Sequence, residues 1–230
     1  MKYLSSRSLR LVAGVVFLVG LTGTAEALEG EAPAVAAQKI ESSSRNAHLT
    51  VEDRALVDEV SAWFNTVVTL KGLFDQQNQD GTLVGGEFYL RRPGRMRFEY
   101  AEPQQLTLLS DGLWVALNDR ELESVDRYPL RETPLWLILK KHVDLAVDAD
   151  IVRVERQGAL VGVTVREEEG AAAGVLTLVF AAPRLDLRHW IVEDVQGNRT
   201  IVSLRRMEQG MSLSPELFIV EDYDYGFEDD

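Results

Sequence analysis

The chain has 230 residues, no cysteine and a formal net charge of −13 at pH 7. The absence of cysteine excludes a disulfide framework, thiolate catalysis, cysteine-bound zinc and a lipid-modified N-terminal cysteine. A charge this negative repels phosphate backbones and anionic lipid surfaces, so the composition argues against nucleic-acid binding and against electrostatic adhesion to a membrane.

The first 27 residues have the three parts of a secretory signal peptide. Lys2, Arg7 and Arg10 form a basic start, residues 11–21 are apolar, and residues 25–27 read Ala-Glu-Ala, a small-residue cleavage pattern. The apolar run is shorter than the roughly 18–20 residues that span a bilayer. We therefore expect cleavage after residue 27, which removes three basic and one acidic residue and leaves a soluble, exported chain with a net charge of −15.

A leader and a helix are predicted next. Residues 28–48 are rich in Ala, Glu and Ser and have no apolar period, which predicts a flexible leader. Thr50 resembles an N-cap, and apolar side chains follow it at helical spacing up to Trp63 and beyond. This pattern predicts an amphipathic helix over residues 51–65.

Period-two patterns separated by glycine-containing turns fill most of the remaining chain. They predict short antiparallel strands that follow one another as a meander. The predicted strands cover about residues 70–77, 86–92, 96–100, 106–108, 113–117, 121–127, 151–156, 160–166, 175–180, 190–195 and 199–206.

One helical segment, residues 134–142, is predicted to interrupt the meander. Thr133 is expected to cap it, Pro134 to take the first helical position, and the five residues that follow are all apolar. A helix that is apolar on every side must be buried, either by protein or by a ligand.

The sequence shows no constellation of catalytic or metal-binding residues. His48, His142 and His189 have no metal-ligand spacing, and Ser110-Asp111 has no histidine nearby for a hydrolase triad. Gly85-Gly86 is not followed by a helix and is therefore not a phosphate-binding loop. We expect no enzymatic activity, no bound metal and no cofactor.

Arg92 is the charged residue of most interest. On the predicted strand 86–92 it points to the same face as Phe88 and Leu90. If that face is the apolar interior, Arg92 is a buried cation that needs acceptors, such as the free carbonyls at the end of a covering helix. The alternative is that Pro93 ends the strand and Arg92 turns outward.

The order of several motifs resembles the outer-membrane lipoprotein carrier (LolA) family over most of residues 50–225. The pattern Gly-x-Phe-x-Leu-x-Arg-Pro-Gly-Arg-x-Arg-Phe-x-Tyr-x-x-Pro, matched by residues 86–103, and the later Asp-Gly-x-x-Val pattern carry most of this resemblance. The matching blocks are Leu73–Gln76, Gly85–Phe98, Tyr100–Pro103, Leu109–Val115, Asp119, Leu130 and Thr133–Leu135.

The resemblance implies a mainly β (α+β) fold for residues 49–225, with an acidic tail at 226–230. The expected architecture is a strongly curved, unclosed antiparallel sheet (half barrel) of about eleven strands, with a lid of two or three helices on its concave side. Arg92 matches the family's arginine that holds the lid through backbone hydrogen bonds. The apolar cavity for acyl chains is expected to be lined by Trp63, Phe88, Leu90, Met96, Phe98, Trp114, Leu135, Trp136 and Ile138.

The function implied by the resemblance is that of a monomeric chaperone in the Gram-negative periplasm. It would receive acylated lipoproteins from an inner-membrane lipoprotein-releasing ABC transporter, shield their acyl chains, and carry them to the outer membrane, where an acceptor can take them. Two alternatives stay open: a periplasmic lipoprotein-binding sensor or regulatory module of the same fold, and an acyl hydrolase.

Overall fold

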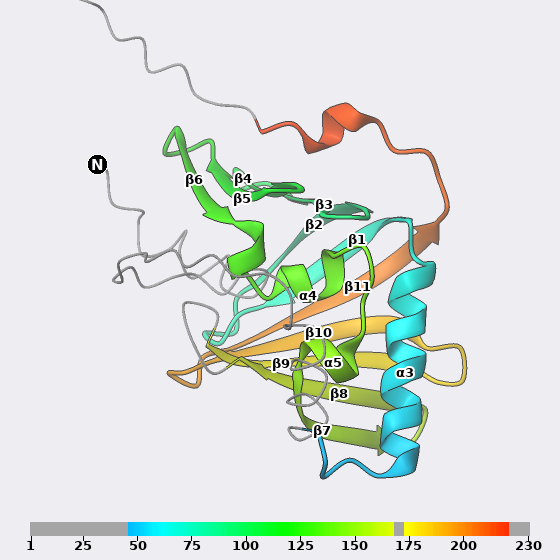
Figure 1. Cartoon of the computed structure of the whole chain (residues 1–230). Helices are drawn as coiled ribbons and strands as arrows, with labels where there is room; N and C mark the ends of the chain where they lie inside the picture. The colour runs from blue at the N-terminus through cyan, green and yellow to red at the C-terminus, as the bar shows by residue number, and fades with distance from the viewer. Residues whose placement is uncertain (1–45, 168–172, 221–230) are drawn as a thin grey trace, which may run out of the picture.

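A single antiparallel β-sheet dominates the computed structural model, which describes residues 46–167 and 173–220 (Figure 1). Its strand order is β6-β5-β4-β3-β2-β1-β11-β10-β9-β8-β7, so β6 and β7 are the edges and the sheet is not closed. The strands are β1 (Thr69–Gln77), β2 (Leu83–Arg91), β3 (Arg95–Tyr100), β4 (Leu106–Asp111), β5 (Trp114–Asp119), β6 (Ser124–Pro129), β7 (Asp150–Gln157), β8 (Leu160–Glu167), β9 (Gly174–Ala181), β10 (Asp186–Asp194) and β11 (Arg199–Gln209).

The sheet curves around three helices that cover its concave side, as Figure 1 shows. The predicted fold, an unclosed sheet of eleven antiparallel strands with a few lid helices, is confirmed. The predicted signal peptide and acidic tail, with most of the predicted leader, lie outside the described residues. No helix of the described part is both long and apolar enough to span a membrane.

One predicted strand begins later than its sequence pattern indicated. We expected a strand from residue 121, whereas β6 starts at Ser124. The side-chain oxygen of Asp119 accepts hydrogen bonds from the backbone N–H groups of Glu121 and Leu122, at 3.0 and 3.1 Å. These bonds close a turn and take up the donors that a strand would need.

The first lid helix, α3 (Val51–Thr66), agrees with the predicted helix to within one residue. It begins with a capping box, in which the Thr50 hydroxyl accepts from the Asp53 N–H and the Asp53 carboxylate accepts from the Thr50 N–H. Such a box satisfies two donors that the first helical turn leaves free. Its buried face, which includes Val57, Val60 and Phe64, belongs to the main hydrophobic core.

The predicted helix 134–142 is shorter than expected: after the 3-10 turn η1 (Leu130–Glu132), α4 covers only Leu135–Leu139. A further short helix, α5 (Leu145–Asp148), follows beyond the predicted segment. The expectation that Thr133 caps the helix is wrong, because its hydroxyl donates to the carbonyl of Leu130 at 2.8 Å. Pro134 takes the capping position without a side-chain hydrogen bond.

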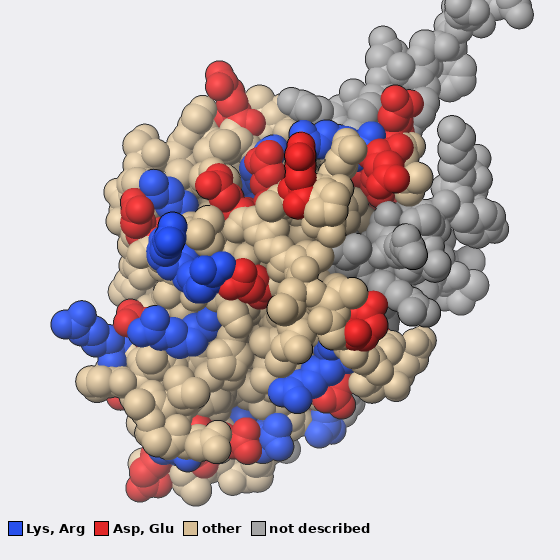
Figure 2. Space-filling view, turned by 180° about the vertical axis from the view of Figure 1, so that it is seen from behind, with Lys and Arg blue, Asp and Glu red and all other residues tan. Residues whose placement is uncertain are grey.

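The convex face of the sheet carries a second, smaller packed region. The 3-10 helix η3 (Pro215–Phe218) contacts β3 and β4 on the side away from the lid (Figure 1), and Phe218 is 3% exposed. We call residues 210–220 the strap. Beside the strap, Arg97 pairs with Glu99 and donates to the carbonyl of Leu217 at 3.5 Å. Figure 2 shows acidic and basic side chains interspersed on the rear surface.

Candidate ligand-binding cavity

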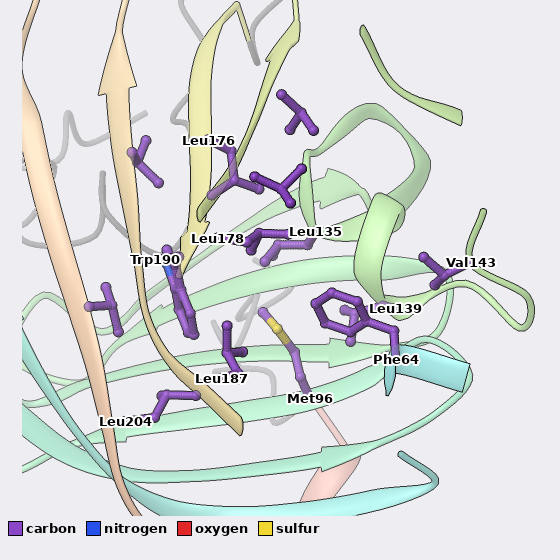
Figure 3. Close-up of a cluster of buried hydrophobic side chains, with 14 of the residues drawn as sticks. Phe64, Met96, Leu135, Leu139, Val143, Leu176, Leu178, Leu187, Trp190 and Leu204 are labelled. Carbon is purple, nitrogen blue, oxygen red and sulfur yellow. The ribbon is translucent and has the colours of Figure 1, made fainter. Parts of the chain in front are cut away.

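An apolar cavity of about 40 Å³ lies between the lid and the concave face of the sheet. Figure 3 shows several of its side chains converging from α3, α4 and the strands. This volume holds about three water molecules, so an alkyl chain fits only after the lid moves. The lining residues are Trp63, Phe64, Val67, Leu70, Phe88, Leu90, Arg92, Met96, Phe98, Leu135, Ile138, Leu139, Leu187, Trp190 and Leu204.

Most of the residues predicted for the cavity surround it. They are Trp63, Phe88, Leu90, Met96, Phe98, Leu135 and Ile138. Trp114 does not line it and its side chain is 44% exposed, because the next residue, Val115, takes the inward position on β5. Trp136 does not line it either; the Arg131 guanidinium lies over its ring at 5.0 Å.

Sequence reasoning missed the contribution of the second half of the chain. Leu187 and Trp190 from β10 and Leu204 from β11 complete the cavity wall. Strand alternation places Trp190 and Val192 inward, and a register shift between Leu187 and His189 brings Leu187 to the same face. What the alternation does not reveal is which strands curve beneath α3 and α4.

Aromatic rings make much of the cavity wall rigid. Phe98 stacks on Phe88 with a centroid distance of 5.6 Å and meets Trp190 edge-on at 6.0 Å. From the lid side, Trp63 packs edge-on against Phe180 at 5.3 Å. Such pairs add to the free energy of area burial and fix ring orientation. The wall therefore has a defined shape, and the short α4 covers it with Leu135, Ile138 and Leu139.

Arg92 points inward and holds the end of α4. Its Nη2 donates to the backbone carbonyl of Lys140, with a longer contact of 3.4 Å to that of Lys141. The N–H of Gly94 donates to the carbonyl of Leu139 at 2.8 Å. The turn between β2 and β3 thus supplies donors for carbonyls that a helix end leaves free.

The inward position is unfavourable for the Arg92 guanidinium in two respects. Burial lowers the pKa of Arg92 below its ordinary value, because the charged form loses hydration. Its Nε is buried and has no hydrogen-bond partner among the described residues. Of the two orientations that the sequence left open, the structure shows the inward one.

Three polar side chains tie the lid helices to one another. Asn65 of α3 exchanges two hydrogen bonds with the backbone of Val143, at 2.8 and 2.9 Å. The Ser61 hydroxyl accepts from the N–H of Leu145 at 3.0 Å. Asn46, within the segment predicted to be a leader, is 1% exposed and donates to two carbonyls of the α5 region. The lid is therefore one connected unit.

Within residues 46–167 and 173–220, no three His, Asp or Glu side chains are grouped closely enough to hold a metal ion. The histidines lie on separate elements: His48 precedes α3, His142 lies between α4 and α5, and His189 is on β10. Burial lowers the pKa of His189 below its ordinary value. Its ring lies on the strand face opposite Trp190 and therefore away from the cavity.

The chain matches the family described as outer membrane lipoprotein carrier protein LolA over residues 65–221. It belongs to this family. The match includes β1–β11 and the cavity residues of the sheet, α4 and α5, and begins near the C-terminal end of α3.

Two curated relatives are named outer-membrane lipoprotein carrier protein. That of Alkalilimnicola ehrlichii is 37% identical over 81 residues, which are 32% of this chain and 37% of the relative. That of Methylococcus capsulatus is 29% identical over 153 residues, 63% of this chain and 70% of the relative. A crystal structure of a LolA superfamily protein from Nitrosomonas europaea covers 71% of this chain and 97% of its own, with a TM-score of 0.41 and 8% identity.

Proposed function

We propose that this LolA-family protein is a periplasmic lipoprotein carrier. It receives acylated lipoproteins from an inner-membrane ABC transporter, shields their acyl chains between lid and sheet, and delivers them to the outer membrane. The observation that carries the proposal is the apolar cavity under a lid that a few hydrogen bonds attach to the sheet.

The free energy of hydration explains why a carrier needs such a cavity. Exposing an acyl chain of about fifteen carbons to water costs roughly 12 kcal/mol, at about 0.8 kcal/mol per methylene. A soluble carrier must exclude water from the chain throughout transfer. Because the lid rests on the sheet and leaves only about 40 Å³ between them, the apolar lining is shielded from water and need not stay exposed between loads.

Opening requires that the contacts at the end of α4 break. These are the bonds from Arg92 to Lys140 and from Gly94 to Leu139. A hydrogen bond to a charged group contributes about 1.5–3 kcal/mol, far less than the burial of one acyl chain provides. Acyl-chain entry can therefore displace the lid, and its departure lets the same contacts form again.

A pair of neighbouring substitutions on α4 tests the role of the cavity. Ile138 and Leu137 are both half-buried, but only Ile138 lines the cavity. Proteoliposomes that contain the transporter and a triacylated lipoprotein would be mixed with purified carrier, and soluble complex measured by size exclusion. We expect Ile138→Asp to abolish the complex and Leu137→Asp to retain most of it.

Two results would contradict the carrier proposal: no soluble complex with the wild-type protein, or equal loss with both variants. Native mass spectrometry of the loaded protein adds an independent readout, since a carrier shows the intact lipoprotein bound. Free fatty acid released at a catalytic rate would instead identify an acyl hydrolase.

A further inference from the structure

The cavity has one charged group in an otherwise apolar lining. Fourteen of its fifteen lining residues are apolar, and the remaining one is Arg92. A purely hydrocarbon ligand would complement the apolar part but leave the cation, which has only backbone carbonyls as acceptors, without an anionic partner. A ligand that complements the whole lining has an alkyl chain and a single end that accepts hydrogen bonds, best with negative charge.

The donors of Arg92 point to a carboxylate. Nε and Nη2 lie on the same edge of a guanidinium, the edge that binds a carboxylate through two parallel hydrogen bonds. Nε has no partner among the described residues, and Nη2 donates only to backbone carbonyls. Arg92 also forms no ion pair with a carboxylate in the described part of the chain.

We propose that the cavity binds free long-chain carboxylates, with the carboxylate on the Nε–Nη2 edge of Arg92 and the alkyl tail among the apolar residues. This inference uses the cavity of the proposed carrier but does not require lipoprotein as cargo. The bound carboxylate takes the place of the Lys140 carbonyl on Nη2, so that ligand entry releases the end of α4. Ligand binding and lid opening are then the same event, in which Arg92 exchanges the Lys140 carbonyl for the ligand carboxylate.

Ligands with the same chain and different ends test this proposal. Dodecanoate, methyl dodecanoate and dodecyltrimethylammonium would compete with a polarity-sensitive fluorescent dye bound to the full mature protein, at concentrations below micelle formation. We expect dodecanoate to bind at least about tenfold more tightly than the ester, as charge-assisted hydrogen bonds allow. The cationic ligand should bind most weakly.

The ratio of the carboxylate and ester affinities is the quantity to compare between variants. Arg92→Gln also loosens the lid, but this affects both ligands and cancels in the ratio. We expect the ratio to fall to near one in Arg92→Gln and to stay at its wild-type value in Arg95→Gln. Arg95 is exposed, begins β3 directly after the same turn and does not line the cavity, so it is the matched control.

The outcomes separate this proposal from the carrier function. A ratio near one in the wild-type protein, or a ratio that survives in Arg92→Gln, overturns the carboxylate site and leaves the carrier proposal standing. If none of the three ligands displaces the dye, the cavity does not open to alkyl chains and both proposals fail. The wild-type comparison decides the matter even if Arg92→Gln does not fold.

Discussion

Arg91 and Arg92 are neighbours in sequence and hold different parts of the molecule on opposite faces of the sheet. Arg91 points outward, donates to the carbonyl of Leu213 at 3.2 Å and lies over the Phe218 ring at 5.0 Å. Arg92 points inward to the carbonyl of Lys140 at the end of α4. Both guanidinium groups donate hydrogen bonds to backbone carbonyls. The strap, however, covers packed side chains, whereas the lid covers a cavity.

The difference between strap and lid lies in what surrounds each arginine contact. In the strap, buried Leu213 and Phe218 support it, and the Thr69 hydroxyl adds a bond to the carbonyl of Met211 at 2.8 Å. At the end of α4 the buried Leu139 itself lines the cavity, and the hydrogen bonds from Arg92 and Gly94 hold the carbonyls of Lys140 and Leu139 beside it. We infer that the outer contact is permanent and the inner one exchangeable.

Removing the packed side chain of the strap should have the largest effect. Phe218→Ala deletes a side chain that is almost fully buried, and we expect the free energy of unfolding to fall by about 3–5 kcal/mol. Urea denaturation measures this, with Leu217→Ala, at a half-buried position, as the control. A loss below about 1 kcal/mol would show that the strap is not an integral part of the fold.

The lid should respond to a change in its internal hydrogen bonds. Asn65→Ala leaves the N–H and the carbonyl of Val143 without their partner, which we expect to cost about 2 kcal/mol. Asn65→Asp keeps the acceptor and should cost about half as much. Hydrogen exchange would show faster exchange of the Val143 amide, whereas equal protection in all three proteins would contradict a connected lid.

The two arginines give the most direct comparison. Arg91→Leu should lower the free energy of unfolding by about 1 kcal/mol and leave exchange of the α4 amides unchanged. Arg92→Leu should change the unfolding free energy less, because the loss of a hydrogen bond is offset by relief of a half-buried cation. Its effects should be faster exchange in α4 and impaired loading or delivery of lipoprotein.

A reversal of these two phenotypes would contradict the assignment of permanent and exchangeable contacts. Circular dichroism of both variants serves as the control for folding. Wild-type rates of acceptance and delivery in Arg92→Leu would show that Arg92 has no part in lid movement.

The positions of the strands and of α3 could be predicted from the sequence because their determinants are local, whereas the curved, unclosed sheet was expected from the family resemblance. Period-two alternation and glycine-containing turns located all eleven strands, and the capping pair at Thr50 and Asp53 set the start of α3. The end of α4 at Leu139, short of the predicted residue 142, could not be predicted in this way. It depends on Arg92 and Gly94, which take the carbonyls at the end of α4 from a distant part of the chain.

The cavity residues likewise differ in whether a local pattern or the tertiary structure determines their position. Alternation places Val115 inward and therefore Trp114 outward, so this error came from giving aromatic size more weight than strand alternation. Trp190 and Leu204 were missed for a different reason. Their inclusion depends on how far the sheet curves under the lid, which no short pattern encodes.

Lowering the pH should weaken the attachment of the lid helix α3 before that of the strap. Of the expected changes in the free energy of unfolding, this one is the smallest. The side-chain hydrogen bond from Arg156, followed by that with Thr50, lowers the pKa of Asp53 below its ordinary value of 3.8. The ionised Asp53 carboxylate therefore stabilises the folded state above that value, and the contribution is lost as the pH falls through the lowered pKa.

The contacts of the strap behave differently, because Arg91 and Thr69 donate to backbone carbonyls, which do not titrate. Asp53→Asn should be less stable than wild type at neutral pH, and the difference should shrink as the pH falls below the ordinary value of 3.8 and through the lowered pKa. Urea denaturation at a series of pH values measures it, and amide exchange at the start of α3 follows the local opening. A difference that stays constant with pH would mean that the Asp53–Arg156 pair does not hold the lid to β7.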